Sequence, residues 1–237
     1  SSKVGYVPDS FGHIATLPFI LRGFGISTFI FFRGVGDEGE RRKDEFAWTA
    51  PDGSSVLAVF LRGGYCHANG IGLRNNAVPG YALTPYDFSM KRPEYYRRIA
   101  SELEMREQNS AFNTYLFLNG CDHMPPQDLT QVLEVASSSF KGVEFRVSDL
   151  DEYAREIEKE AETRVLASYR GELRGARYTE IDPGTLSTRA DVKQKNYYAE
   201  LTLESYAEPL MALMMTLGQT PRSLIYAWKL VLKSQAH

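Results

Sequence analysis

The chain has 237 residues, of which 43% are hydrophobic and 24% are charged, and its formal net charge is −3. This length and composition are ordinary for one large globular domain, or one and a half, with a substantial core. The weak negative charge without a compensating basic stripe argues against nucleic acid as the main partner. The longest apolar run, residues 27–32, is too short to cross a membrane.

Two cysteines, Cys66 and Cys121, are present, and the chain contains no CxxC motif. Nothing in their spacing pairs them, so we expect neither a disulfide framework nor a zinc finger. Few cysteines also favour a reducing compartment, and we expect a cytoplasmic protein. No signal peptide is visible, although the first residue, a serine, does not resemble a natural start.

Strands and helices are predicted to alternate from the N-terminus. Residues 4–7 indicate the end of a buried strand, and apolar spacing predicts a helix over 14–24. A buried, β-rich strand over 27–32 follows. Segments 46–49 and 56–61 flank a Pro-Asp-Gly turn, which indicates a hairpin or two adjacent strands.

Residues 63–93 lose this periodicity, and loops of that length in a compact domain usually carry function. The next predicted elements are a helix over 95–108, a strand over 114–118, a helix over 127–140, a strand over 143–147 and a helix over 150–162. This alternation predicts an α/β fold, an irregular (β/α) barrel with mostly parallel strands, over residues 1–165.

The last part of the chain changes character. Residues 166–193 are irregular and predict a connecting segment. Residues 194–237 carry two long apolar helices, one over 196–217 and one from Pro221 onward, joined by a short turn. We expect an antiparallel pair that forms the first helices of a helical bundle.

Two aspartates stand at the C-terminal ends of predicted strands. Asp9 follows the first strand and Asp122 follows the strand over 114–118. In a β/α barrel this end lines the active site. Two carboxyl groups about 5–5.5 Å apart can cleave a glycosidic bond with retention, one as nucleophile and one as acid/base. The plain alternative for Asp9 is a helix cap.

Segments spread along the whole chain resemble glycoside hydrolase family 38, the retaining α-mannosidases, in its bacterial type. In the family's order they are residues 5–13 (GYVPDSFGH), 17–26 (LPFILRGFGI), 32–34 (FRG), 46–54 (FAWTAPDGS), 118–123 (LNGCDH), 227–229 (AWK) and 235–237 (QAH). Each match is short, but together they are specific. They indicate a catalytic-domain fragment of such an enzyme.

The resemblance implies roles for individual residues. Asp9 matches the catalytic nucleophile, which also binds zinc, and Asp122 matches the general acid/base. His237 matches a further zinc ligand. Four residues match positions near the substrate: Phe11, Arg33, Tyr65 and His67.

The family's other two zinc ligands belong to a His-x-Asp element that would precede Ser1, and no His-x-Asp occurs in this chain. With two of four ligands, we expect this chain alone to hold zinc poorly and to be inactive. Cys121 stands where some relatives carry a second acid.

The expected activity is therefore zinc-assisted hydrolysis of terminal α-mannosidic bonds through a mannosyl-Asp9 intermediate. The substrate is an α-mannoside oligosaccharide or a mannosylated small molecule, and linkage and oligomeric state stay open. One alternative is a metal-dependent polysaccharide deacetylase, although its usual His-x-x-x-His element is absent. Another is a non-catalytic piece with a structural or carbohydrate-binding role, which the missing ligands favour.

Overall fold

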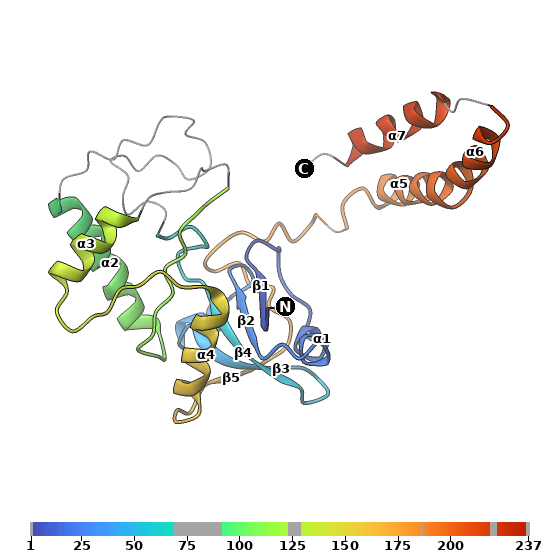
Figure 1. Ribbon diagram of the computed structural model, residues 1–237. Coiled ribbons are helices and arrows are strands. Elements are labelled where there is room, and N and C mark those ends of the chain that lie inside the picture. Colours follow the sequence, from blue (N-terminus) through green and yellow to red (C-terminus); the bar gives the residue numbers. More distant parts are fainter. Residues whose placement is uncertain (1, 69–91, 123–128, 186, 219–221, 236–237) are drawn as a thin grey trace. The chain divides into compact units, whose positions relative to one another are not determined.

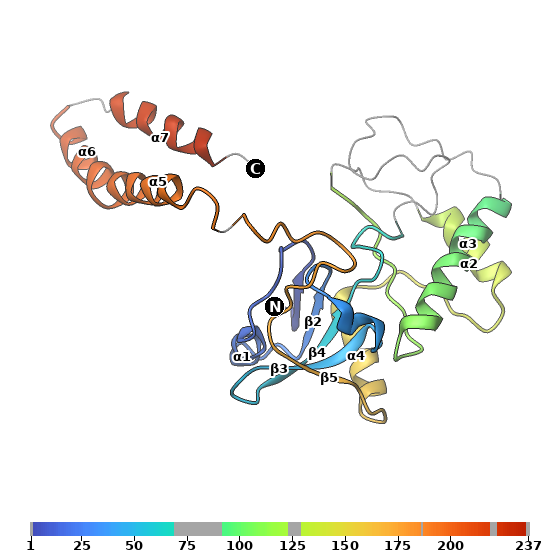
Figure 2. The same ribbon diagram turned by 180° about the vertical axis from the view of Figure 1, so that it is seen from behind.

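The structure, a computed structural model, describes residues 2–68, 92–122, 129–185, 187–218 and 222–235. The chain divides into two compact units, Ser1–Ile181 and Asp182–His237 (Figures 1 and 2). The predicted connecting segment over 166–193 is thus split between them. Its first part belongs to the first unit because it contributes a strand to the central sheet.

A five-stranded mixed sheet lies at the centre of the first unit (Figure 1). Its strands are β1 (Val4–Val7), β2 (Thr28–Phe31), β3 (Glu45–Thr49), β4 (Ser55–Phe60) and β5 (Ser168–Arg170). Their order is β1-β2-β4-β3-β5, and every neighbouring pair is parallel except the β3–β4 hairpin. The α/β prediction with mostly parallel strands is confirmed. A closed barrel is not, because β1 and β5 are edge strands within the described residues.

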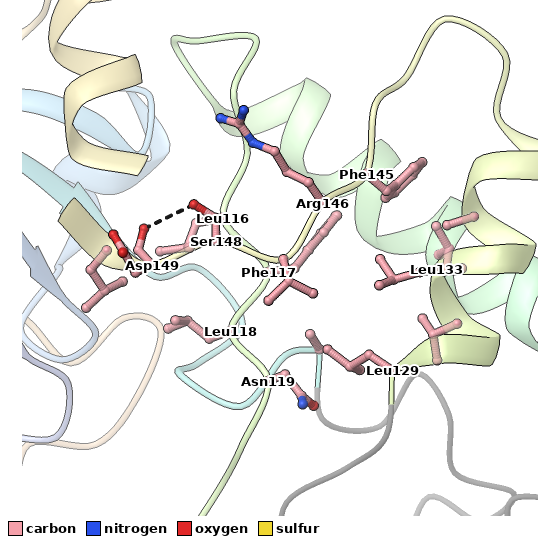
Figure 3. A pocket seen from close by; sticks show the side chains of 16 residues that line it. Leu116, Phe117, Leu118, Asn119, Leu129, Leu133, Phe145, Arg146, Ser148 and Asp149 are labelled. Carbon is pink, nitrogen blue, oxygen red and sulfur yellow. Dashed lines mark hydrogen bonds between the residues drawn. The ribbon is translucent and has the colours of Figure 1, made fainter. Parts of the chain in front are cut away.

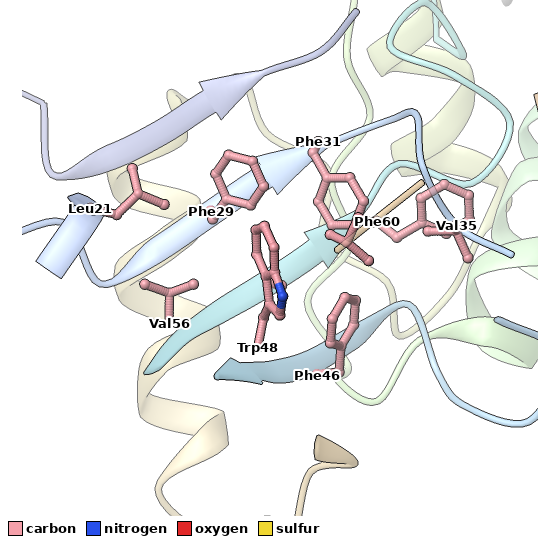
Figure 4. Packing of buried hydrophobic residues seen from close by; sticks show 10 residues of the cluster. Leu21, Phe29, Phe31, Val35, Phe46, Trp48, Val56 and Phe60 are labelled. Carbon is pink, nitrogen blue, oxygen red and sulfur yellow. The ribbon is translucent and has the colours of Figure 1, made fainter. Parts of the chain in front are cut away.

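Both faces of the sheet are covered, and β2 is buried along its whole length, as expected for a central parallel strand. Phe29 and Phe31 alternate with Ile30 along β2 and point to the opposite face. Phe29 and Phe31 pack with Trp48 from β3 (Figure 4). Ile30 packs against Ile157 of a helix on the other side.

Four helices belong to the first unit: α1 (Leu17–Gly23), α2 (Arg92–Asn109), α3 (Thr130–Ser139) and α4 (Leu150–Ala161). All four fall within or close to predicted helices. Helix α4 begins at Asp149, whose side chain accepts a hydrogen bond from the Glu152 N–H at 2.7 Å, the geometry of an N-cap. Helices α2 and α3 pack together through Ile99, Leu103 and Val135.

Two predicted strands, 114–118 and 143–147, belong to no strand ladder in the part of the chain that the structure describes. In the first, side chains replace a neighbouring strand as backbone partners. Glu160 accepts from the Thr114 N–H, and the ring of His67 accepts from the Leu118 N–H. In the second, Val147 is 71% exposed, so the burial that the apolar pattern predicted does not occur.

The second unit contains α5 (Ala190–Thr202), a π-helical turn (Leu203–Ala207), α6 (Glu208–Met215) and α7 (Arg222–Ser234). The hydroxyl of Ser234 donates to Asn196, and the indole N–H of Trp228 donates to Glu208. Residues later in α7 therefore contact residues earlier in the chain, so α7 runs antiparallel to α5 and α6. That these helices begin a helical bundle stays a prediction. No described helix is long and apolar enough to span a membrane.

Candidate active site

Asp9 and Arg33 meet at one edge of the sheet. Strands β1 and β2 are parallel, and their last residues, Val7 and Phe31, are paired in register. The residues that follow both strands therefore emerge side by side. Arg33 Nε donates a 2.6 Å hydrogen bond to Asp9 Oδ1. The Arg33 side chain is 12% exposed while that of Asp9 is 41% exposed. A largely buried guanidinium group therefore binds a carboxylate that solvent can reach.

The remaining contacts of Arg33 fix its orientation. Its Nη1 donates to the Thr179 hydroxyl at 3.0 Å and to the Glu180 carbonyl at 2.8 Å. The guanidinium carbon lies 4.4 Å from the centroid of the Phe11 ring, within cation–π range. Burial lowers the pKa of Arg33, but its bonds to Asp9 and Glu180 outweigh burial and raise it. The guanidinium of Arg33 therefore stays positively charged, and its contacts fix its orientation.

The segment that carries Thr179 crosses the ends of β1 and β2 at close range. Gly175 forms a bridge with Gly34, and Leu173 forms one with His13. A Cβ on Gly175 would lie 2.2 Å from Gly36 Cα, so only glycine permits this approach. Sequence reasoning read this segment as a connector, and its glycines were the one local signal of a close crossing.

Tyr65 links the two predicted catalytic carboxylates. Its hydroxyl donates to Asp122 Oδ2 at 2.9 Å, and its ring packs edge-on against Phe32. Burial, the hydrogen bond to Asp122 and the negative charges of Asp9 and Asp122 raise the pKa of Tyr65 to about 12, and Arg33 opposes them. Tyr65 therefore stays protonated as a hydrogen-bond donor in ordinary buffers. The Phe32 ring also lies 5.5 Å from the guanidinium carbon of Arg33. Tyr65 therefore contacts Asp122 directly and the Arg33–Asp9 pair through Phe32.

Cys66 and Cys121 form a disulfide, with Cα atoms 5.0 Å apart. The expectation of unpaired cysteines is wrong. They are 55 residues apart in sequence, and only the fold brings the segment after β4 next to the segment after Leu118. The bond joins the residue after Tyr65 to the residue before Asp122.

His67 turns both ring nitrogens toward the backbone. Nδ1 lies 2.7 Å from the Gly64 carbonyl oxygen, and Nε2 lies 2.7 Å from that of Leu116. Burial, aided by the charge of Arg106 and opposed by these hydrogen bonds, lowers the pKa of His67 to about 4. The ring is therefore neutral at pH 7. A neutral ring carries one proton, so it donates either to Gly64 or to Leu116, and Nε2 accepts from the Leu118 N–H only when the proton is on Nδ1. Substrate contact by His67 stays a prediction.

His13 is buried among Phe29, Phe31 and Trp48, and its ring donates to the backbone carbonyl of Arg33. Burial lowers the pKa of His13 to about 4, and the bond to the carbonyl only partly opposes it. This histidine therefore supports the strand end that carries Arg33. Sequence reasoning gave it only a local hydrogen-bonding role.

The predicted zinc ligands are only partly within the described residues, because His237 lies outside them. Among the residues described, no three His, Cys, Asp or Glu side chains are grouped to hold a metal ion. Asp9 is the one predicted zinc ligand among the described residues, and its Oδ1 accepts a hydrogen bond from Arg33. A protein zinc site normally takes three or four protein ligands. The described residues therefore do not make a complete zinc site.

Comparisons with known proteins agree on one family. The family model described as glycosyl hydrolases family 38 N-terminal domain matches residues 1–172. A protein of Halalkalibacterium halodurans named putative mannosylglycerate hydrolase is 30% identical over 248 residues, which cover 99% of this chain and 26% of that protein. A solved structure of an α-mannosidase from Enterococcus faecalis matches with a TM-score of 0.68 and 27% identity, covering 98% of this chain and 25% of that one. The chain spans about a quarter of the length of these two relatives.

Proposed function

Because the chain belongs to glycosyl hydrolase family 38, we propose that this protein hydrolyses terminal α-mannosidic bonds with retention of configuration. The observation that carries the proposal is the position of Tyr65. This phenol is hydrogen-bonded to Asp122 and lies in the fields of Asp9 and Arg33. A retaining glycosidase needs two carboxyl groups close together. The contacts of Tyr65 with Asp122 and, through Phe32, with Arg33 support such a pair.

In the first step, Asp9 attacks the anomeric carbon while Asp122 gives its proton to the leaving oxygen. The glycosidic bond breaks and a mannosyl-Asp9 ester forms. In the second step, Asp122 takes a proton from water, which displaces Asp9 from the sugar. Arg33 holds Asp9 Oδ1, so we assign the attack to Oδ2. The separation of the two carboxyl groups, about 5–5.5 Å for retention, stays a prediction.

Phe11 is the proposed apolar wall of the sugar subsite. Phe11 is 40% exposed, and the guanidinium of Arg33 lies over its ring, so the orientation of the ring is set before a sugar binds. Arg33, Tyr65 and His67 complete the proposed substrate-binding set. For His67 the contacts to Gly64, Leu116 and Leu118 favour an indirect role through the backbone.

Zinc at Asp9 and His237 stays a proposal that rests on the family resemblance. None of the proton and bond transfers described depends on it. Elemental analysis of the purified polypeptide, as its gene encodes it, tests the proposal. Loss of bound zinc in Asp9→Ala and His237→Ala variants would support these two ligands.

The substrate is proposed to be an α-mannoside oligosaccharide or a mannosylated small molecule, and the names of the two relatives represent both classes. The cytoplasm stays the proposed location, but the Cys66–Cys121 disulfide removes the argument from unpaired cysteines that favoured it. Since cytosolic thiols are usually reduced, the thiol state of Cys66 and Cys121 in fresh cell extracts checks it.

The deciding experiment is hydrolysis of a chromogenic α-mannoside by the full polypeptide. Asp9→Ala should lower kcat/KM by about 1,000-fold or more, and the first-formed mannose should be the α-anomer by NMR. Glu162→Ala, which removes an exposed carboxylate just after α4 and 40 positions beyond Asp122, is the control and should retain activity. Activity that survives Asp9→Ala would refute the mechanism. A protein inactive on every α-mannoside would favour the deacetylase or the non-catalytic alternative.

A further inference from the structure

We propose that the Cys66–Cys121 disulfide is a positioning element for acid catalysis, which keeps the Tyr65 hydroxyl on Asp122. Reduction of this bond is then expected to weaken protonation of the leaving group. The inference rests on the proposed role of Asp122 as general acid/base and adds to it a redox-dependent element.

The geometry places the disulfide directly beside the hydrogen-bonded pair. Tyr65 precedes Cys66, and Asp122 follows Cys121. The covalent S–S bond and the 2.9 Å Tyr65–Asp122 hydrogen bond are therefore neighbouring links between the same two segments. A change in the separation of the two cysteine Cα atoms is transmitted within one residue to both members of the pair.

Further contacts join the same segments, and one of them places His67 Nε2 2.7 Å from the Leu116 carbonyl oxygen. The Ala68 N–H donates to the Leu118 carbonyl at 3.0 Å, and the ring of His67 accepts from the Leu118 N–H at 3.2 Å. These bonds align residues 64–68 with residues 116–122, but each is a single hydrogen bond of modest net strength. The disulfide is the one covalent restraint on this alignment within the described residues.

The segment that leads to Asp122 is held by side-chain packing and single hydrogen bonds, and not by a sheet. Residues 114–120 take part in no strand ladder in the region that the structure covers, so they lack the row of bonds that usually fixes an active-site strand. Leu116, Phe117, Leu118 and Asn119 instead border an apolar pocket of about 370 Å³ (Figure 3). Space on one side leaves room for this segment to shift. The position of Asp122 then depends on its links to residues 64–68.

Reduction is a balanced two-electron step. A dithiol such as dithiothreitol attacks the S–S bond, releases Cys66 and Cys121 as thiols, and closes to its own cyclic disulfide. The reductant supplies both electrons and both protons. No other chemistry of the site changes, because neither sulfur takes part in the proposed bond-breaking steps.

The test uses a series of aryl α-mannosides whose leaving groups differ in basicity, hydrolysed by oxidised and by dithiothreitol-treated full-length protein. Substrates with basic leaving groups need the acid, and 2,4-dinitrophenyl mannoside needs little protonation. Reduction should lower kcat/KM by about 10-fold for the former and by less than about 2-fold for the latter, since general acid catalysis contributes 10²–10⁴-fold. The double variant Cys66→Ser/Cys121→Ser should have the kcat/KM values of the reduced protein, and dithiothreitol should not change them.

Two readouts decide the proposal without activity. Thiol titration should detect no free Cys66 or Cys121 before reduction and two afterwards. Hydrogen exchange of peptides that cover residues 64–68 and 113–122 should quicken on reduction, whereas a peptide covering β2 should not change. Free thiols in the untreated protein, unchanged exchange, or equal losses for all leaving groups would each overturn the proposal.

These outcomes separate the inference from the proposed function. If the oxidised protein cleaves no α-mannoside, the proposed function fails, and the role of the disulfide in acid catalysis falls with it. If the oxidised protein is active, Asp122→Ala selectively slows substrates with basic leaving groups, and reduction has no effect, only the disulfide proposal fails.

Discussion

At the scale of single residues, Arg33 unites the ends of three segments by donating to Asp9, to Thr179 and to the carbonyl of Glu180. Arg33→Met should lower kcat/KM by about 100-fold, because Asp9 loses the partner that orients it. Arg33→Lys should fall between this variant and the wild type, since lysine keeps the charge without the planar fork. Steady-state kinetics on an aryl α-mannoside measures both.

The matched control for Arg33 is Arg22→Met, at the exposed end of α1. It removes the same charge at a site away from the candidate carboxylates and should leave kcat/KM unchanged. Equal losses in the Arg33 and Arg22 variants would mean that net charge, and not the contact with Asp9, is responsible.

Glu45, in β3, is a buried carboxyl group that the proposed chemistry does not use. Burial raises its pKa to about 7, although the Ala111 N–H and the Ser110 hydroxyl donate to it. Since its ordinary value is 4.5, the folded protein binds this proton more tightly than the unfolded chain. The resulting stabilisation is complete below about pH 4.5 and is lost as the pH rises through about 7. The free energy of unfolding should fall across this window by roughly 3 kcal/mol at most.

Glu45→Gln should flatten this dependence, because an amide does not titrate. Urea unfolding at pH 5 and pH 8 measures the difference between the two midpoints. Glu162→Gln, an exposed residue after α4, should keep the wild-type difference. If Glu45→Gln retains the full wild-type difference, another group is responsible for the pH dependence.

At the scale of elements, the segment after β5 depends on its glycine. A methyl group on Gly175 would lie 2.2 Å from Gly36 Cα and 2.7 Å from the Val35 carbonyl carbon, and both are backbone atoms that cannot move aside easily. Gly175→Ala should lower the free energy of unfolding by about 2 to 3 kcal/mol. Activity should fall too, because the segment carries Thr179 and Glu180 to Arg33.

Gly23→Ala is the control for this prediction. Gly23 ends α1, and a Cβ there would have no atom within 4 Å. Because alanine favours helix over glycine, this variant should be neutral or slightly stabilised. Thermal unfolding of the two variants side by side measures the contrast. Equal stability of the two variants would contradict the prediction, because it would mean that the segment around Gly175 accommodates a methyl group without loss of stability.

At the scale of the whole molecule, the second unit presents many large apolar side chains to solvent. Those more than half exposed include Tyr197, Tyr206, Leu210, Leu213, Ile225, Tyr226 and Leu232. Apolar surface of this extent usually marks an interaction site or promotes aggregation. We expect the 237-residue chain, prepared alone, to self-associate and to bind the dye ANS strongly.

Leu213→Lys combined with Leu232→Lys should reduce this association, which analytical ultracentrifugation measures as a shift toward monomer. Val165→Lys, in the first unit, changes another fully exposed apolar residue and serves as the control. A chain that is already monomeric at tens of micromolar would contradict the prediction.

Local patterns determined the elements and part of the site. Hydrophobic patterns and turn residues located the sheet strands from β1 to β4 and the helix α4, because these signals act over a few neighbouring residues. Asp9 and Arg33 follow β1 and β2, which the structure pairs in parallel, and the family resemblance had already assigned both residues to the site. Their direct contact at one end of the sheet was found only in the structure.

Only the tertiary structure decided the other half of the site. The Cys66–Cys121 disulfide, the Tyr65–Asp122 hydrogen bond and the crossing at Gly175 each join residues more than 50 positions apart. The predicted strand over 114–118 formed no ladder in the described part of the chain, because Glu160 and His67 bind its backbone. Such contacts depend on which segments the sheet order brings together, and no spacing within either segment records that order.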